Sequence, residues 1–442
     1  MNPERTLLLI GGRDEALVQA RKLGLNVLLL QHPDKITEEQ RQLADIVRVV
    51  DFTEWALVEA AARDLYRFPG FAAVVSLTEP GLEPAGRLND MFSLGGTGYE
   101  VTHRIRDKWA MRRHLAERDP LAVGAALLRE RADLTEFGAR HGYPFIVKPI
   151  DATASVGVCS VDGPGDIDRV WAHVQGLRGT RTDRISTMYL LQDFMMEEYV
   201  DGPEYSVESF SFAGRHVVVA ITEKFTEVGH FAELGHALPA RLPEAVREQV
   251  RDRVSRFLDL MGFADGVCHT ELRIDPSGPR IIESHNRLGG DAISDLVAGA
   301  YGIDLTTLAV GWPFRLVDEL PDRPVAHAGA STRTVIGEPG RVTSVSGAEA
   351  AAAQEGVLAV QITAAPGDTV RALRDNWDRL GLVAVTGSDT TDAIERGARL
   401  IRDSIDIRLV TADGRPGRAY PAEVAGPAEV PVPAALTATA ER

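Results

Sequence analysis

Short apolar runs alternate with amphipathic segments along the first hundred residues. Buried-strand patterns occur at 5–12, 26–30, 46–50 and 72–76, and a helical pattern runs from about Asp14 to Lys22. Strands that alternate with helices are typical of βαβ units and a parallel sheet. The Gly11-Gly12 pair after the first strand lacks a full GxGxxG motif. The pattern therefore predicts a Rossmann-like N-terminal domain without a bound dinucleotide.

A predicted β-hairpin at 266–285 carries one carboxylate on each strand. The runs VCHTELRI and PRIIES flank the polar turn Asp275-Pro276-Ser277-Gly278, as in a hairpin. Cross-strand neighbours lie about 5 Å apart, so Glu271 and Glu283 on one face would attract a cation. Oxygen ligands favour Mg²⁺. The alternative is that both are solvent-facing strand residues and that Arg287 pairs with one of them.

The segment after the hairpin combines an arginine with two glycines and an aspartate. Arg287 has a planar fork of donors that suits a phosphoryl group, and Gly289-Gly290 lets the backbone approach a ligand closely. Asp291 has two interpretations. It receives a substrate ammonium or polar side chain, or it caps the helix predicted from about Ile293 to Tyr301.

Two lysines precede the hairpin. Lys148 ends an apolar strand at 144–149, and the small residues at 151–158 follow it. Such a loop can fold backbone N–H groups over phosphates, although a plain hairpin turn is the alternative. A Walker A motif is absent. Lys108 lies on a helix predicted from 106 to about 117, where a lysine is ordinarily a surface charge.

Two further segments carry candidate binding residues. In EEYVDGPE, an extended edge formed by Glu197, Glu198 and Val200 would offer backbone groups to an adenine, and Glu204 would accept from ribose hydroxyls. At 229–239, the residues His230, Glu233 and His236 look like a zinc cluster. Their spacing differs from HExxH and no second ligand group accompanies them, so a solvated loop is one alternative.

Composition narrows the class of protein. A chain of 442 residues suggests several domains, and its hydrophobic and charged fractions are those of a globular protein. A net charge of −16 argues against a nucleic-acid partner. Two cysteines provide neither a disulfide framework nor a thiolate metal site. The sequence shows no membrane span and no signal peptide, which predicts a cytoplasmic protein.

Lys108, Lys148 with its loop, EEYVDGPE, TEL and ESHNR occur in an order that resembles the ATP-grasp superfamily of carboxylate–amine ligases. Within it, the chain is most similar to L-amino-acid ligases of the bacilysin-synthesis and carnosine-synthase type. The resemblance implies an α/β fold, with α+β character in the ATP-binding lobes. It divides the chain into a Rossmann-like domain (1–100), a small lobe (101–200), a large lobe (201–325) and a C-terminal lobe (326–411). The Pro/Ala-rich tail (412–442) is expected to be disordered.

The resemblance also implies residue roles. The ATP-phosphate ligands would be Lys108, Lys148, Ser155 and Val156. The adenine hinge would comprise Glu197, Glu198 and Val200, with Glu204 on the ribose. Glu271 and Glu283 would hold Mg²⁺, or Mn²⁺ in its place, and the catalytic residues would be Arg287 and Lys148. The substrate site would comprise Glu233, His236, Arg287, Gly289, Gly290 and Asp291. His285 stands where the family has a metal-binding Asn, and imidazole is a poorer Mg²⁺ ligand, so the number of metal ligands stays open.

The implied reaction is ATP-dependent ligation. A carboxylate attacks the γ-phosphorus of ATP, and an amine then displaces phosphate from the acyl-phosphate to give an amide. The partners would be small-molecule acids and amines, and a homodimer is compatible with the sequence. Two alternatives remain: another ATP-grasp ligase of the carboxylase or purine-pathway type, and a non-catalytic nucleotide-binding protein on the same fold.

Overall fold

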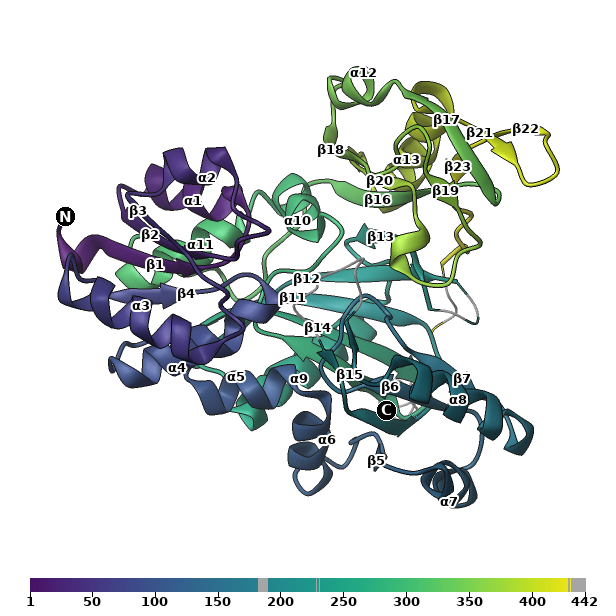
Figure 1. Cartoon of the computed structure of the whole chain (residues 1–442), viewed down its shortest axis with the longest axis horizontal. Coiled ribbons are helices and arrows are strands. Elements are labelled where there is room, and N and C mark those ends of the chain that lie inside the picture. The colour runs from purple at the N-terminus through teal and green to yellow at the C-terminus, as the bar shows by residue number, and fades with distance from the viewer. Residues whose placement is uncertain (182–189, 228, 230, 428–429, 431–442) are drawn as a thin grey trace, which may run out of the picture.

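A computed structural model describes residues 1–181, 190–227, 229, 231–427 and 430 (Figure 1). His230 lies outside the described residues. The N-terminal domain is a parallel sheet of order β3-β2-β1-β4, which confirms the predicted Rossmann-like arrangement. Its elements are β1 (Thr6–Ile10), α1 (Asp14–Lys22), β2 (Asn26–Gln31), α2 (Glu38–Leu43), β3 (Ile46–Val49), α3 (Trp55–Arg67), β4 (Ala73–Val75), η2 (Glu79–Gly81), α4 (Leu82–Met91) and α5 (Tyr99–Arg106).

Alternation along β1 explains how this sheet is covered on both faces. Leu7 and Leu9 pack with α1, whereas Leu8 and Ile10 pack with α3 and α4 on the opposite face. Because successive side chains of a strand point to opposite faces, an unbroken apolar run is buried on both sides. The carboxyl end of β4 then leads through Thr78 and Glu79 toward the rest of the molecule.

The small lobe is an antiparallel sheet of order β5-β10-β6-β7, and α7 and α8 share its apolar core. Asp107 caps α6 by accepting from the Ala110 N–H at 2.7 Å, so the helix that bears Lys108 begins at Lys108 itself. The elements are α6 (Lys108–Ala116), β5 (Ala125–Leu128), α7 (Arg131–His141), β6 (Phe145–Pro149), β7 (Cys159–Val161), α8 (Ile167–Leu177), β8 (Thr180–Arg181), β9 (Leu190–Leu191) and β10 (Phe194–Glu198).

One nine-stranded sheet joins the large lobe to the C-terminal lobe. Its order is β15-β14-β11-β12-β13-β16-β20-β18, and β23 also pairs with β16. In Figure 1 the strands run from β14 near the centre to β16 and β20 at the upper right. The elements are β11 (Glu204–Phe212), β12 (Arg215–Thr226), β13 (Glu233–Leu238), α9 (Glu244–Met261), β14 (Gly266–Asp275), β15 (Gly278–His285), α10 (Ile293–Tyr301), α11 (Leu305–Gly311), η4 (Trp312–Phe314), β16 (Gly329–Ile336), β18 (Val357–Ile362) and β20 (Gly381–Gly387).

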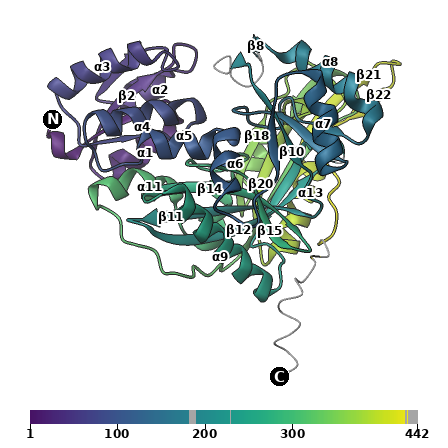
Figure 2. The same cartoon turned by 90° about the horizontal axis from the view of Figure 1, so that it is seen from below.

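A second sheet, of order β19-β17-β21-β22, completes the C-terminal lobe. The remaining elements are β17 (Gly340–Ser346), α12 (Ala348–Ala352), β19 (Thr369–Val370), η5 (Asn376–Asp378), α13 (Thr390–Ser404), β21 (Asp406–Thr411), β22 (Pro416–Arg418) and β23 (Tyr420–Pro421). Figure 2 shows the molecule from below, with β21 and β22 of this lobe on the side away from the N-terminus.

The expectation of disorder from residue 412 onward is wrong for residues 416–422. β22 pairs with β21 and β23 pairs with β16, and Ala422 is buried, with its carbonyl accepting from Arg333. Sheet pairing therefore orders a segment whose composition alone favours disorder. Residues 428–429 and 431–442 lie outside the described residues.

Within the described part of the chain, no single helix is both long and apolar enough to cross a membrane; only α10 taken together with α11 and η4, a pair bent by 100°, meets that test.

Candidate active site

A cavity of about 1600 Å³ is lined by residues of the N-terminal domain and all three lobes. A second cavity, of about 1130 Å³, adjoins it and shares Ser155, Glu204 and Lys224 with it. Every residue to which the resemblance gave a site role lines the larger cavity: Lys108, Lys148, Ser155, Val156, Glu197, Glu198, Val200, Glu204, Glu233, His236, Glu271, Glu283, Arg287, Gly289, Gly290 and Asp291. Segments far apart in the chain thus meet in one place.

The predicted hairpin is present as β14 and β15, and a β-bulge between Glu271 and Leu272 makes Glu271 and Glu283 directly paired residues. Their carboxylates are not solvated strand charges. Lys224 donates to Glu271 at 2.6 Å, and the Lys108 ammonium lies 2.9 Å from Glu283. Burial would raise the pKa of each glutamate, but Lys224 with His269 beside Glu271, and Lys108 with His285 beside Glu283, together lower each pKa far below its usual range. Two adjacent anionic oxygen donors fit Mg²⁺.

His285 bridges two carboxylates and is not turned toward a free metal position. Its Nε2 lies 3.2 Å from Glu283 and its Nδ1 lies 2.9 Å from Glu79. Asn286 donates to Thr102 on α5 at 3.3 Å, away from the hairpin carboxylates. At the hairpin, the two glutamates would therefore be the protein ligands of a metal, and waters and phosphate oxygens would supply the rest of its shell.

Glu79 is a buried acid that sequence reasoning passed over. It accepts from Arg287 Nε at 2.5 Å and lies 3.3 Å from Arg106. Burial would raise the pKa of Glu79, but His285 and Arg287 outweigh it and hold the pKa far below its usual value. The N-terminal domain thus orients the guanidinium proposed for phosphoryl transfer. The signal in the sequence was Thr78-Glu79-Pro80 at the carboxyl end of a parallel strand, where ligand-binding residues often lie.

Glu197 has a different place from the one predicted. It lies inside β10, which is paired on both edges by β5 and β6, so its backbone forms no free edge for an adenine. Its carboxylate instead pairs with Lys148 and accepts from Arg112 at 2.9 Å. Burial lowers the pKa of Lys148, and Glu197 opposes that effect. Glu197 therefore holds Lys148 in place.

The other hinge candidates also have protein partners. Glu198 accepts from the Gly124 N–H at 2.8 Å, and the Val200 carbonyl accepts from Arg273 at 3.2 Å. Arg273 also donates two hydrogen bonds to Glu204, at 3.1 and 3.0 Å. The ribose candidate is thus held in a fixed orientation at the start of β11.

Lys224 is the second functional residue that sequence reasoning missed. Its ammonium lies 2.8 Å from Glu204, 3.0 Å from Glu233 and 2.6 Å from Glu271. The three N–H donors of this ammonium therefore contact one carboxylate from each of the proposed ribose, substrate and metal subsites. Burial would lower the pKa of Lys224, but these glutamates raise it well above its usual value. The available signal was a lysine that ends the apolar run VVVAIT of a buried strand.

The phosphate loop after Lys148 contains an unusual backbone. Ala154 and Ser155 have φ values of 59° and 60°, and Gly157 has a φ of 71°. Successive N–H groups in such conformations form concave anion-binding nests. The Ser155 hydroxyl donates to the Phe231 carbonyl at 3.0 Å, which links the loop to the segment before β13.

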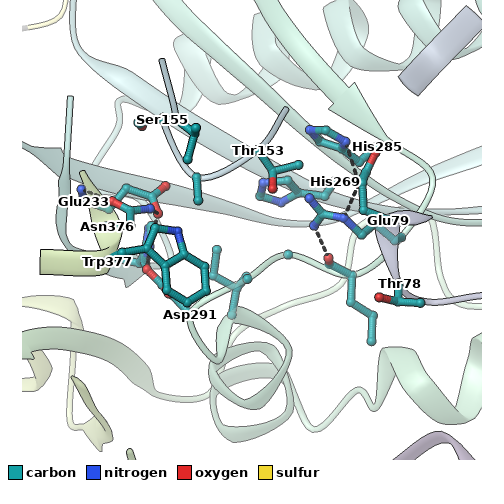
Figure 3. Close-up of a pocket in the computed structure, with 18 of the residues that line it drawn as sticks. Thr78, Glu79, Thr153, Ser155, Glu233, His269, His285, Asp291, Asn376 and Trp377 are labelled. Atoms are coloured by element: carbon teal, nitrogen blue, oxygen red, sulfur yellow. Dashed lines mark hydrogen bonds and ion pairs between the residues drawn. The ribbon is translucent and has the colours of Figure 1, made fainter. Parts of the chain in front are cut away.

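Asp291 does not cap α10. The cap position is Ala292, whose side chain makes no capping hydrogen bond. The Asp291 carboxylate instead accepts from Arg379 Nη1 at 2.5 Å and Nη2 at 2.8 Å, and lies 3.3 Å from His236 Nε2. Figure 3 shows Glu233, Asn376, Trp377 and Asp291 grouped at one end of the cavity, and Glu79, His269 and His285 at the other.

Comparison with known proteins agrees with this geometry. Residues 141–295 match the ATP-grasp domain, and residues 333–410 match L-amino acid ligase C-terminal domain 2. The chain is 34% identical over 131 residues to carnosine synthase 1 of Gallus gallus, covering 29% of this chain and 14% of that protein. It is 22% identical over 266 residues to the L-arginine-specific L-amino acid ligase of Bacillus subtilis, covering 59% and 62%.

The crystal structure of an L-amino acid ligase from Bacillus licheniformis has the same fold. It superimposes with a TM-score of 0.77 at 20% identity, over 92% of this chain and 99% of that one. The chain therefore contains an ATP-grasp domain at residues 141–295. With its L-amino acid ligase C-terminal domain, it is an enzyme of the ATP-dependent carboxylate–amine ligase class.

Proposed function

We propose that the protein joins an amino-acid carboxylate to an amine, a second amino acid in the dipeptide case, through an acyl-phosphate, releasing ADP and phosphate. The observation that carries this proposal is the meeting of two opposed glutamates, two buried lysines and Arg287 in one cavity. Phosphoryl transfer depends mainly on positioned positive charge, and this arrangement provides it. The named relatives include amino-acid ligases.

Mg²⁺ bound by Glu271 and Glu283 would supply charge neutralisation on the ATP phosphates. Lys108 and Lys148 lie in the same cavity and would place their ammonium groups on phosphate oxygens. Arg287, held by Glu79, would face the charge that develops on the transferring phosphoryl group. The loop at 151–158 would cover the phosphates and exclude water, which would otherwise hydrolyse the acyl-phosphate.

The opposite end of the cavity would bind the ammonium of the acid substrate. Ligand atoms of Glu233, His236 and Asp291 all lie within 4.8 Å of one another. The acceptors for an ammonium would be the carboxylates of Glu233 and Asp291, whereas His236 Nε2, 3.3 Å from Asp291, donates to that carboxylate. A divalent metal ion also binds groups of ligand atoms that lie this close together, but Arg379 already contacts Asp291 and Lys224 already contacts Glu233.

Phosphate release from ATP across a matrix of amino-acid pairs, with products identified by mass spectrometry, tests the proposal. Release that requires one amino acid as acid and a second as amine, together with a dipeptide mass, is the expected result. Release that requires bicarbonate or a ribonucleotide would assign the chain to another ATP-grasp reaction. No turnover with a wide panel of acids and amines would favour a non-catalytic nucleotide-binding role.

A further inference from the structure

The C-terminal lobe reaches into the proposed ammonium site through two side chains, Asn376 and Arg379. Asn376 lies on η5, and Arg379 follows that short helix directly. Both residues line the large cavity, and Figure 3 shows Asn376 beside Glu233. Neither residue is on the ATP-grasp domain itself, which matches at 141–295.

Asn376 fixes Glu233 at two points. Its carbonyl oxygen accepts from the Glu233 backbone N–H at 2.7 Å, and its amide nitrogen donates to Glu233 Oε2 at 2.6 Å. The side-chain amide of Asn376 therefore fixes the position of both the backbone and the carboxylate of Glu233. Lys224 holds the other carboxylate oxygen at 3.0 Å, so the direction in which Glu233 can accept a further donor is defined.

Arg379 fixes Asp291 in the same manner. Its fork donates to both Asp291 oxygens, while its Nε donates to the Asn376 carbonyl at 2.8 Å and its Nη1 donates to the Glu233 carbonyl at 3.2 Å. Four of its five N–H groups are thus used within the protein. Arg379 therefore cannot serve as the main receptor for a substrate carboxylate, and its role is to orient other groups.

The segment that Arg379 holds is strained. Asp291 and Ala292 have φ values of 49° and 61°, and two consecutive non-glycine residues in the left-handed region are costly unless the surroundings fix them. The Arg379 fork is the contact that fixes Asp291. Strain held at the edge of a cavity is a feature of ligand-binding sites.

We propose that Asn376 and Arg379 are positioning residues that complete the ammonium receptor, so that selection of an α-amino acid as the acid substrate depends on the C-terminal lobe. This inference rests on the proposed function. It assigns to the lobe a role in choosing the substrate: without these two residues, the carboxylates of Glu233 and Asp291 no longer present a fixed set of acceptors.

Hydroxylamine as the amine substrate provides a direct test, because the acid is then the only variable and the hydroxamate product is measured. The acid is the best amino acid from the matrix, compared with its 2-hydroxy analogue. A site built to bind a substrate N–H group rejects an analogue without it by about 10⁴-fold. We expect the wild-type ratio of kcat/KM values to exceed 100-fold.

Asn376→Leu and Arg379→Lys should each lower this ratio at least tenfold, with the KM for ATP unchanged within twofold. Arg379→Lys keeps the positive charge and loses only the planar fork of donors. This conservative variant therefore still tests the inference if Asn376→Leu prevents folding. Arg374→Gln is the matched control, since Arg374 on the same segment pairs with Asp378 at 2.9 Å. The control should keep the wild-type ratio.

Three other results of the hydroxamate assay are possible, and each contradicts a different statement. A merely structural role would lower the rates with both acids equally and leave the ratio unchanged, which contradicts the inference while the proposed function stands. If the wild type used the amino acid and its 2-hydroxy analogue with nearly equal kcat/KM, the site would not act as an ammonium receptor. Absence of hydroxamate with every amino acid would instead contradict the proposed function itself.

Discussion

Lys224 donates to Glu271 at 2.6 Å, and Glu271 is one of the two carboxylates that face each other across the β14–β15 hairpin. A protein cation therefore occupies one side of the proposed metal ligand. The same ammonium contacts Glu204 and Glu233. Lys224 therefore contacts one acid from each of the proposed ribose, metal and substrate subsites, so we expect binding at one subsite to change the electrostatic environment of the others.

Replacing Lys224 with methionine should reveal this linkage. Loss of one partner of a buried ion pair costs about 3–5 kcal/mol, so the melting temperature of Lys224→Met should fall. Mg²⁺ that binds Glu271 would replace part of the lost charge and, as a ligand of the native state, stabilise the variant. Thermal melts with and without Mg²⁺ should therefore show a larger stabilisation in the variant than in the wild type.

A suitable control for this prediction is Arg241→Met. Arg241 pairs with Glu223, the neighbour of Lys224 on β12, at 2.8 Å. This variant should be destabilised without any extra response to Mg²⁺. If both variants respond to Mg²⁺ equally, the effect does not arise from the hairpin glutamates.

Glu283→Gln should weaken metal binding while the fold persists. The change removes one anionic oxygen from the proposed Mg²⁺ pair and reduces the attraction of Lys108, which still donates to the Ala152 carbonyl at 2.7 Å. The apparent Mg²⁺ requirement of ATP-dependent phosphate release should rise at least tenfold. Glu83→Gln, which loses pairs with Arg106 and His103 away from the hairpin, should keep the wild-type Mg²⁺ requirement. Near-normal turnover by Glu283→Gln would refute the metal assignment.

Arg287→Lys separates transition-state stabilisation from ATP binding. The lysine keeps the charge but loses the planar fork that Glu79 orients at 2.5 Å. Removal of one well-placed donor to developing charge costs about 10²–10³ in kcat, and the KM for ATP should change little. An equal loss of ATP binding would place Arg287 on the ground-state nucleotide.

Local sequence patterns predicted the elements whose formation depends on nearby residues. The hairpin followed from its polar turn, but the pairing of its two glutamates did not: the turn alone would place Glu271 opposite Ile282, and a β-bulge between Glu271 and Leu272 brings it opposite Glu283. Helix α10 begins at Ile293 and ends at Tyr301, with Gly302 in the left-handed region beyond it, as the sequence indicated. The five ordered motifs led to the ATP-grasp class because each marks a short segment with its own turn or strand pattern.

Contacts between distant segments could not be predicted in the same way. The Arg287–Glu79 pair joins residues 208 positions apart, and the Arg379–Asp291 pair joins residues 88 positions apart. Asp291 looked equally suited to capping and to binding, because the choice depends on an arginine from another lobe. The backbone of Glu197 is enclosed by β5 and β6, and only the order of the sheet reveals that.

The buried pair of Asp119 and Arg253 provides a pH test of how the small lobe is attached to helix α9. Arg253 donates to the two Asp119 oxygens at 2.7 and 2.6 Å. Burial would raise the pKa of Asp119, but Arg253 outweighs it and lowers the pKa below its ordinary value of 3.8. A carboxyl group with a lowered folded-state pKa stabilises the protein above its unfolded-state pKa, and that stability is lost as the pH falls through the folded-state pKa. Asp119→Asn should therefore melt at a lower temperature than the wild type at pH 7, and the difference should shrink below about pH 4. A difference that stays constant from pH 7 to pH 3 would show that the charge of Asp119 does not contribute.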